Sequence, residues 1–108
     1  MSTFIRIARS SDVKERFGTG KEINGISIAL FRHKGRVYAL HNSCPHQGAP
    51  IHPGFVRDDC VVCPHHGWTF RLEDGAFIHN DMLRIRTYPV KEEDGNIFIN
   101  PDPEDQPA

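Results

Sequence analysis

Short runs of alternating apolar and polar residues follow one another along most of the chain. Phe4–Ala8 alternates with a period of two, and Ile26–Arg32 is an almost continuous apolar run. A period of two is typical of a half-buried β-strand, because successive side chains point to opposite faces. Further runs of this kind are Arg36–His41, Thr69–Leu72, Ala76–Ile78, Ile85–Val90 and Asn96–Ile99. The pattern therefore predicts a chain built mainly of short strands.

Glycine-bearing turns separate three pairs of these runs. The turns are His33–Gly35, Glu73–Gly75 and Asp94–Gly95, and each predicts a β-hairpin. Helical periodicity is weak and confined to Ser11–Phe17. Strands at this spacing predict an all-β fold, a small antiparallel sandwich or barrel. The cysteine-rich and histidine-rich segments fall between predicted strands, where loops on a rigid sheet commonly carry function.

The chain is long enough for one domain. Its 108 residues can bury a modest core but not a second catalytic domain. We expect a single domain over residues 1–100. Residues 101–108 are acidic and rich in proline, and we expect them to form a disordered tail.

Charge and hydropathy exclude two classes of partner. The formal net charge is −1, which argues against a nucleic-acid-binding protein. No run approaches the roughly 18 apolar residues of a membrane span, and the first residues lack the apolar core of a signal peptide. We therefore expect no membrane partner and a cytoplasmic location.

Two short segments each place a thiol close to an imidazole. They are Cys44-Pro45-His46 and Cys63-Pro64-His65-His66. Three cysteines, an odd number in a chain without a secretory signal, make a disulfide framework a poor explanation. Thiolate and imidazole together suit zinc, copper or iron–sulfur chemistry. Three interpretations remain: packed thiols with solvated loop histidines, a structural zinc site, and an iron–sulfur centre.

Spacing separates these interpretations. Structural zinc sites typically use Cys-x₂₋₄-Cys and His-x₃₋₅-His pairs, so that one loop wraps one ion. Here each segment carries one cysteine and one histidine ligand candidate, and a single residue separates Cys44 from His46. In an extended chain such neighbours lie roughly 6.5–7 Å apart. The spacing therefore favours two adjacent metal ions over one tetrahedral ion, and two compact pairs are too regular for unrelated loop residues.

The two segments, separated by sixteen residues, resemble the Rieske [2Fe–2S] motif Cys-x-His…Cys-x₂-His. The resemblance covers Ile26–Ile99, including VYAL before the first segment and TYPV near the end. The chain is similar both to small Rieske ferredoxins and to the small subunit of NAD(P)H-dependent nitrite reductase. This resemblance implies one [2Fe–2S] cluster per chain, with Cys44 and Cys63 on one iron and His46 and His66 on the other. It also implies stacked small antiparallel sheets, with two loops holding the cluster at a tip.

Other cysteine and histidine residues receive different interpretations. The family spacing implies that His66, and not the adjacent His65, is the ligand. Cys60 alternates out of phase with Cys63 on a predicted strand, so we expect it to face the opposite side and to serve in packing. Four further histidines are interpreted as loop or surface residues (His41 and His52) or as solvated turn residues (His33 and His79).

Departures from the high-potential Rieske proteins of respiratory complexes imply a low reduction potential. Those proteins carry a disulfide between the two cluster loops, but the matching positions here are Ala49 and His65. They also donate hydrogen bonds to the cluster sulfurs from a serine and a tyrosine, where this chain has Trp68 and Phe70. Fewer hydrogen bonds to sulfur lower the potential, so we expect a value on the order of −150 mV.

The resemblance implies an electron-transfer component rather than an enzyme on its own. The chain has no room for the mononuclear iron domain of Rieske oxygenases, and it lacks a Gly-x-Gly-x-x-Gly fingerprint. We expect a one-electron ferredoxin that accepts electrons from an NAD(P)H-dependent flavoprotein reductase and feeds a terminal oxygenase. His46 and His66 would be the electron exit, with Gln47, Pro64 and His65 around them. The alternative is the small subunit of assimilatory NAD(P)H nitrite reductase, bound to its large subunit.

Overall fold

The computed structural model describes residues 4–45, 48–64 and 67–101. Over these ranges the chain forms twelve β-strands, one short 3₁₀-helix and no α-helix, so the all-β prediction is confirmed. The strands are β1 Ile5–Arg9, β2 Gly18–Ile23, β3 Ile26–His33, β4 Arg36–His41, β5 Phe55–Arg57, β6 Cys60–Val62, β7 Thr69–Arg71, β8 Ala76–Phe77, β9 Asn80–Arg84, β10 Thr87–Tyr88, β11 Val90–Glu93 and β12 Asn96–Ile99. The 3₁₀-helix, η1, is Ser10–Asp12.

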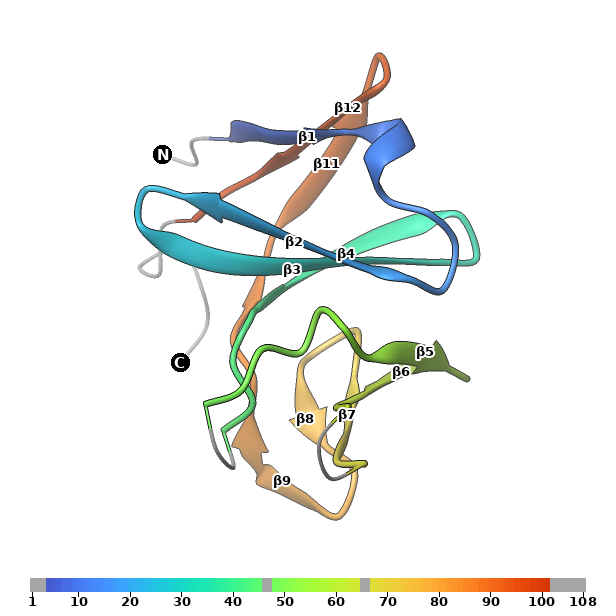
Figure 1. Cartoon of the computed structure of the whole chain (residues 1–108), viewed down its shortest axis with the longest axis vertical. Helices are drawn as coiled ribbons and strands as arrows, with labels where there is room; N and C mark the ends of the chain where they lie inside the picture. The colour runs from blue at the N-terminus through green and yellow to red at the C-terminus, as the bar shows by residue number, and fades with distance from the viewer. Residues whose placement is uncertain (1–3, 46–47, 65–66, 102–108) are drawn as a thin grey trace.

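These strands form three small antiparallel sheets. The first sheet has the order β1-β12-β11, the second β10-β4-β3-β2, and the third β5-β6-β7-β8-β9. In Figure 1 the first sheet lies at the top, the second across the middle and the third at the bottom. This stack of small sheets is the architecture that the Rieske resemblance implied.

Strand β3 of the middle sheet is buried on both faces. On one face of β3, Ile28 and Leu30 belong to the hydrophobic cluster shared with the first sheet. On the other face, Ala29 and Phe31 belong to the cluster shared with the third sheet. All four side chains are fully buried. A strand covered on both faces has no polar side, which explains why this run is continuous rather than alternating.

Turn chemistry fixes the hairpins. Lys34-Gly35 closes β3–β4 with φ values of 53° and 81°, and Asp94-Gly95 closes β11–β12 with 52° and 77°. Positive φ at both residues is the type I′ geometry that matches the twist of paired strands. The predicted hairpin at Glu73–Gly75 is also confirmed, since β7 pairs with β8 across it. A further turn of the same type, Asn24-Gly25, joins β3 to β2, a strand that its glycines and charges hid from the hydrophobic pattern.

The prediction of one strand over Ile85–Val90 is wrong. Thr87–Tyr88 pairs with β4 in the middle sheet, whereas β11, which begins at Val90, pairs with β12 in the first sheet. Pro89 stands between them and has no N–H group to continue a ladder. The chain therefore changes sheets at this proline.

The helical prediction for Ser11–Phe17 is wrong beyond η1. Arg16 has a φ of 73°, and its N–H donates to the carbonyl of Arg32 at 2.8 Å while its own carbonyl accepts from Val56 at 3.3 Å. A right-handed helix needs negative φ values and pairs its backbone groups within itself, whereas Arg16 has a positive φ and bonds to residues of two other segments. This segment therefore joins the middle sheet to the third sheet.

The end of the described chain is packed against the domain. Asn100 is buried, and its N–H donates to the carbonyl of Pro89 at 3.1 Å. Pro101, the first residue of the predicted tail, is buried as well. Residues 102–108 lie outside the described ranges, so the division of the chain at residue 100 and the disorder of the tail stay predictions. Among the described residues, none of the helical structure is long and apolar enough to cross a membrane.

Candidate metal centre

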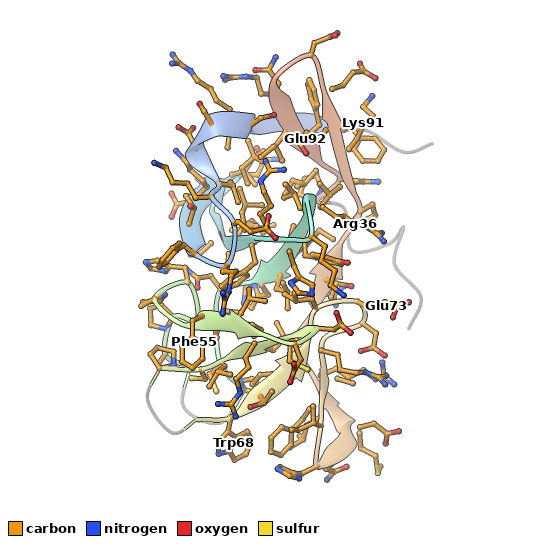
Figure 2. All side chains as sticks on the ribbon, turned by 90° about the vertical axis from the view of Figure 1, so that its right-hand side faces the viewer. Arg36, Phe55, Trp68, Glu73, Lys91 and Glu92 are labelled. Carbon is orange, nitrogen blue, oxygen red and sulfur yellow. The ribbon has the colours of Figure 1, made fainter. Side chains whose placement is uncertain are left out.

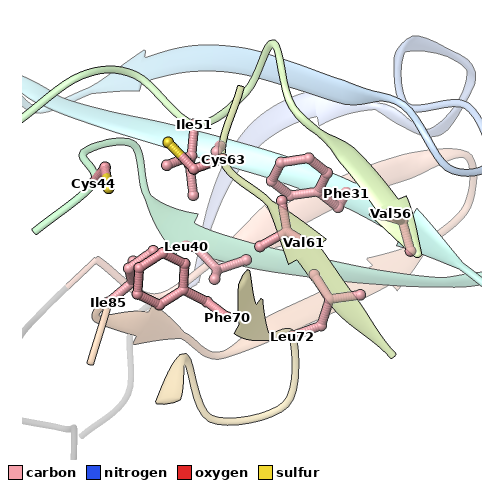
Figure 3. Packing of buried hydrophobic residues seen from close by; sticks show 11 residues of the cluster. Phe31, Leu40, Cys44, Ile51, Val56, Val61, Cys63, Phe70, Leu72 and Ile85 are labelled. Atoms are coloured by element: carbon pink, nitrogen blue, oxygen red, sulfur yellow. The ribbon is translucent and has the colours of Figure 1, made fainter. Parts of the chain in front are cut away.

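Cys44 and Cys63 are buried in the same hydrophobic cluster. Their exposed fractions are 3% and 2%, and the cluster also contains Ile51, Phe70 and other side chains from the middle and third sheets. Figure 3 shows both thiols at the end of this cluster near Ile51. The fold therefore brings together two cysteines that are far apart in the sequence, as the predicted site requires.

The first cysteine loop has a defined backbone geometry. The N–H of Cys44 donates to the carbonyl of Ala49 at 2.8 Å, and the N–H of Gly48 donates to the carbonyl of Cys44 at 2.6 Å. Gly48 has a φ of 73°, which residues with a side chain rarely adopt. Glycine at this position therefore lets the chain fold back on its own cysteine.

The second cysteine loop repeats the same hydrogen bonds. The N–H of Cys63 donates to the carbonyl of Trp68 at 2.7 Å, and the N–H of Gly67 donates to the carbonyl of Cys63 at 3.1 Å. Gly67 has a φ of 69°, and no described atom lies within 4 Å of the position that a Cβ would take. The left-handed backbone, rather than crowding by described atoms, explains this glycine. The two loops therefore share one backbone geometry, and both hold a buried cysteine at the same position within it.

Close backbone contact draws the two loops together. A Cβ at Gly54 would lie 2.1 Å from the carbonyl oxygen of Val62, the residue before Cys63. The N–H of Gly54 donates to the carbonyl of Ile51 at 2.8 Å. Gly54 therefore lets the chain that leaves the first loop run directly against the strand that enters the second.

The second loop lies toward one end of the molecule. Trp68, at the close of this loop, is far from Lys91 and Glu92 at the opposite end (Figure 2). Its ring stacks on Phe77 with centroids 4.4 Å apart, and Phe77 lies 5.5 Å from the ring of Phe70. Trp68 is half-buried and Phe70 is fully buried. Aromatic packing therefore occupies the positions where high-potential relatives are expected to have hydroxyl donors.

The predicted histidine ligands lie outside the described residues. His46 and His66 belong to this group, as do the neighbouring His65 and Gln47. Within the described ranges, no three His, Cys, Asp or Glu side chains come together as a metal site. The complete ligand set therefore stays a prediction, of which the structure shows the two thiols.

The described thiols fit an iron–sulfur cluster. Thiolate sulfur is the preferred ligand of such clusters, and an apolar setting excludes water from them. Cys60 differs, because it alternates with the buried Val61 and stands half-buried on the opposite face from Cys63, as predicted. Burial and the carboxylate of Asp59 raise the pKa of Cys60, so its thiol is protonated and unreactive near neutral pH.

The prediction that His33 is solvated is wrong. Its side chain is only 14% exposed, and its Nε2 lies 2.8 Å from Oδ1 of Asp59. This contact joins the end of β3 to the β5–β6 turn, which a local sequence pattern cannot foresee. His79 is exposed as predicted, with its ring edge-on to Phe77. His41 ends β4 and is half-buried, and His52 lies half-buried in a turn.

Two residues that support the loops were missed. Asn42 is buried and bonds to the backbone of the chain leaving the first loop, and Gly54 permits the contact with Val62. For Asn42 the sequence offered only its position, after a predicted strand and two residues before Cys44. Position alone does not distinguish an internal amide from a solvated one.

The fold and the paired thiol loops define a small all-β domain suited to an iron–sulfur centre. The chain matches the Rieske [2Fe-2S] domain family over residues 3–89, and it belongs to this family. The family is defined by a [2Fe–2S] cluster, which the matched thiols of Cys44 and Cys63 are suited to bind.

Relatives with related sequences include separate ferredoxins and longer enzymes. The chain is 42% identical over 82 residues to the ferredoxin subunit of 3-phenylpropionate/cinnamic acid dioxygenase from Escherichia coli O139:H28, covering 74% of this chain and 76% of that protein. It is 40% identical over 91 residues to 4beta-methylsterol monooxygenase from Methylococcus capsulatus, covering 71% of this chain. The match spans only 24% of that monooxygenase, and a match to a cholesterol 7-desaturase from Xenopus laevis spans 18%.

Solved structures share the whole fold. The ferredoxin of carbazole 1,9a-dioxygenase from Nocardioides aromaticivorans superposes with a TM-score of 0.84 at 27% identity, covering 94% of this chain and 100% of that one. A chain from Mycobacterium tuberculosis described as an NADH-dependent nitrite reductase small subunit gives a TM-score of 0.84 at 25% identity, covering 92% and 95%. Both classes named by the sequence resemblance therefore share this architecture.

Proposed function

We propose that the chain is a one-electron carrier, a Rieske ferredoxin that holds one [2Fe–2S] cluster. Cys44 and Cys63 would bind one iron, and His46 and His66 the other. The observation that carries this proposal is the pair of buried thiols in loops with the same backbone hydrogen bonds. Ferredoxin relatives that match most of their own length support it.

The chain's own residues would shield and orient the cluster. When bound, the cluster supplies reversible one-electron transfer. Cys44 and Cys63 lie in an apolar environment that excludes water from the thiolate side, with Ile51, Phe70 and Ile85 in the same hydrophobic cluster. The backbone bonds of Gly48 and Gly67 hold both loops in a fixed shape, which limits rearrangement during electron transfer.

A low reduction potential belongs to the same proposal. Phe70 has no hydrogen-bond donor on its side chain and is fully buried, and the Trp68 ring stacks on Phe77. Without a hydroxyl donor at Phe70, the reduced cluster receives less stabilisation. We expect a potential near the low end of the Rieske range, on the order of −150 mV.

The proposed partners are proteins. The acceptor would be a terminal oxygenase, since the ferredoxin relatives are named as components of oxygenase systems. The donor would be an NAD(P)H-dependent flavoprotein reductase. The chain would then catalyse no substrate reaction by itself. A second candidate, the small subunit of an NAD(P)H nitrite reductase, is favoured by the fold match to such subunits. The cytoplasmic location remains an expectation.

Electron paramagnetic resonance of the dithionite-reduced protein tests the cofactor, with iron and acid-labile sulfide measured on the same sample. We expect about two irons per chain and a rhombic signal whose average g lies below the free-electron value. A colourless protein loaded with zinc would overturn the electron-transfer proposal. Purification under native conditions then separates the candidates, because a bound subunit copurifies with a large partner and a diffusing ferredoxin does not.

A further inference from the structure

The two cysteine loops are closed in different ways. β6 and β7 pair on either side of the second loop, with Val62 opposite Thr69. The first loop leaves β4 at His41 and enters β5 at Phe55, and these two strands belong to different sheets. No β-ladder can therefore close the first loop, and another set of contacts must hold its two ends together.

The side chain of Asn42 joins those ends. Its Oδ1 accepts the N–H of Ile51 at 2.8 Å and the N–H of His52 at 2.9 Å. Its Nδ2 lies 3.1 Å from Oγ of Ser27 and 3.0 Å from Nδ1 of His52. Asn42 is 8% exposed, so these hydrogen bonds replace contacts with water. An Asn side chain can donate two hydrogen bonds and accept two, and all four are made here.

The backbone groups fix the orientation of this network. An N–H group can only donate, so the amide oxygen of Asn42 must face Ile51 and His52. The amide nitrogen must then face Nδ1 of His52 and donate to it. Nδ1 of His52 is therefore the acceptor in this hydrogen bond.

β2 is shaped to receive the chain that leaves the first loop. A Cβ at Gly20 would lie 3.0 Å from Nδ1 of His52, and a Cβ at Gly18 would lie 2.2 Å from the carbonyl oxygen of His52. The two glycines allow His52 to press against the middle sheet. The Asn42 network thus lies between a sheet on one side and the cysteine loop on the other.

We infer that Asn42 and His52 are positioning residues for the iron–sulfur cluster: their side-chain hydrogen bond, with the two backbone bonds to Asn42, replaces a β-ladder and holds the Cys44 loop in its cluster-binding shape. The inference rests on the proposed function, because it assigns these residues a role in cluster retention. Hydrogen-bond partners that support metal ligands change metal affinity by about 10–100-fold when they are removed. We expect an effect at the lower end of this range, because Asn42 bonds to the backbone that leaves the loop rather than to a ligand, and the Cys44–Ala49 backbone hydrogen bond remains in its absence.

Matched variants distinguish the effect of losing the hydrogen bond from the effect of changing the size of the side chain. His52→Leu removes the acceptor facing Asn42 with a side chain of similar size, whereas His52→Asn keeps an oxygen near the place of Nδ1. Asn42→Leu removes every side-chain bond of the network. Ile97→Val serves as the control, because Ile97 is fully buried in the other hydrophobic cluster, which contains neither Cys44 nor Cys63.

The measurement is the rate at which the purified holoprotein loses its visible absorbance in the presence of an iron chelator, together with its paramagnetic resonance spectrum. We expect Asn42→Leu and His52→Leu to lose the cluster about tenfold faster or more, with broadened spectra. His52→Asn should stay within about threefold of the wild type, and Ile97→Val should keep the wild-type spectrum although it unfolds more easily. Equal rates for His52→Leu and His52→Asn, or an Asn42→Leu rate no higher than that of Ile97→Val, would overturn the inference.

Hydrogen exchange followed by mass spectrometry tests the role of Asn42 separately from the proposed iron–sulfur function. The peptide that carries the amides of Ile51 and His52 should exchange slowly in the wild type and in Ile97→Val, but fast in Asn42→Leu. Slow exchange in all three proteins would reject the role of Asn42 even if the cluster is present. A wild-type protein that holds no [2Fe–2S] cluster would reject the proposed function and, with it, the positioning role, whatever the exchange pattern.

Discussion

Arg32 and Glu92 form a two-point ion pair between β3 and β11, with nitrogen–oxygen distances of 2.8 Å and 3.1 Å. The guanidinium group of Arg32 also donates to the carbonyls of Val13 at 2.8 Å and Ser10 at 3.1 Å. Both charged side chains are mostly buried, at 16% and 29% exposure. One side chain therefore ties the middle sheet to the first sheet and to the η1 segment.

Stability should depend on pH through Glu92. The Arg32 hydrogen bonds hold the pKa of the Glu92 carboxyl below its usual value. A carboxyl with a lowered pKa in the folded state contributes stability above its unfolded pKa of about 4.3, and loses it as the pH falls through the folded pKa. We expect Glu92→Gln to lower the free energy of unfolding by about 1 kcal/mol at neutral pH. Chemical denaturation from pH 7 to pH 3 should show the wild type losing this advantage, and two parallel curves would contradict the prediction.

Gly75 should tolerate no side chain. A Cβ there would lie 1.9 Å from the carbonyl oxygen of Ile85, and its φ is +73°. Gly25 has a similar φ of +78°, but no atom of the described residues lies within 4 Å of its Cβ position. We expect Gly25→Ala to cost about 1 kcal/mol from backbone strain alone and Gly75→Ala to cost about 3 kcal/mol or more. Thermal unfolding of both variants checks this, and equal costs would show that the contact with Ile85 relaxes freely.

Gly54→Ala should push the two cysteine loops apart. The new Cβ would meet the carbonyl of Val62 at 2.1 Å, while the backbone φ of Gly54 is not in the left-handed region. We expect a loss of about 2–3 kcal/mol in unfolding free energy and a lower iron content per folded chain. Pro53→Ala, at the exposed neighbouring position, is the control and should keep full iron content. Normal iron in Gly54→Ala would mean that the loop approach is not needed for binding.

The two adjacent histidines of the second loop should behave differently. We expect His66→Ala to abolish the visible spectrum of the cluster, because the proposed ligand set would lose one imidazole from the second iron. His65→Ala should keep about two irons per chain with an unchanged spectrum. Iron and sulfide analysis of both purified variants decides the assignment. The reverse pattern would move the ligand to His65.

The strand pattern and the hairpins could be predicted because their causes are local. Side-chain alternation marks a strand within a few residues, and the Lys34-Gly35 and Asp94-Gly95 turns need only residues that accept positive φ. The choice of sheet could not be predicted in this way. Ile85–Val90 looks like one strand, yet Pro89 and the partners on either side divide it between two sheets. β2 was missed because its glycines serve contact with His52 rather than a hydrophobic pattern.

The same distinction between local and long-range causes applies to the candidate site. The sequence by itself determined the chemistry, because the order and spacing of Cys44, His46, Cys63 and His66 carry the Rieske motif wherever the loops lie. Only the tertiary structure decided how the thiols meet, through the contact of Gly54 with Val62, and how the first loop is closed, through Asn42. Ligand type is a property of single residues, whereas burial and long-range hydrogen bonds depend on which sheets pack together. That dependence also explains why His33, which the sequence placed in solvent, is held against Asp59.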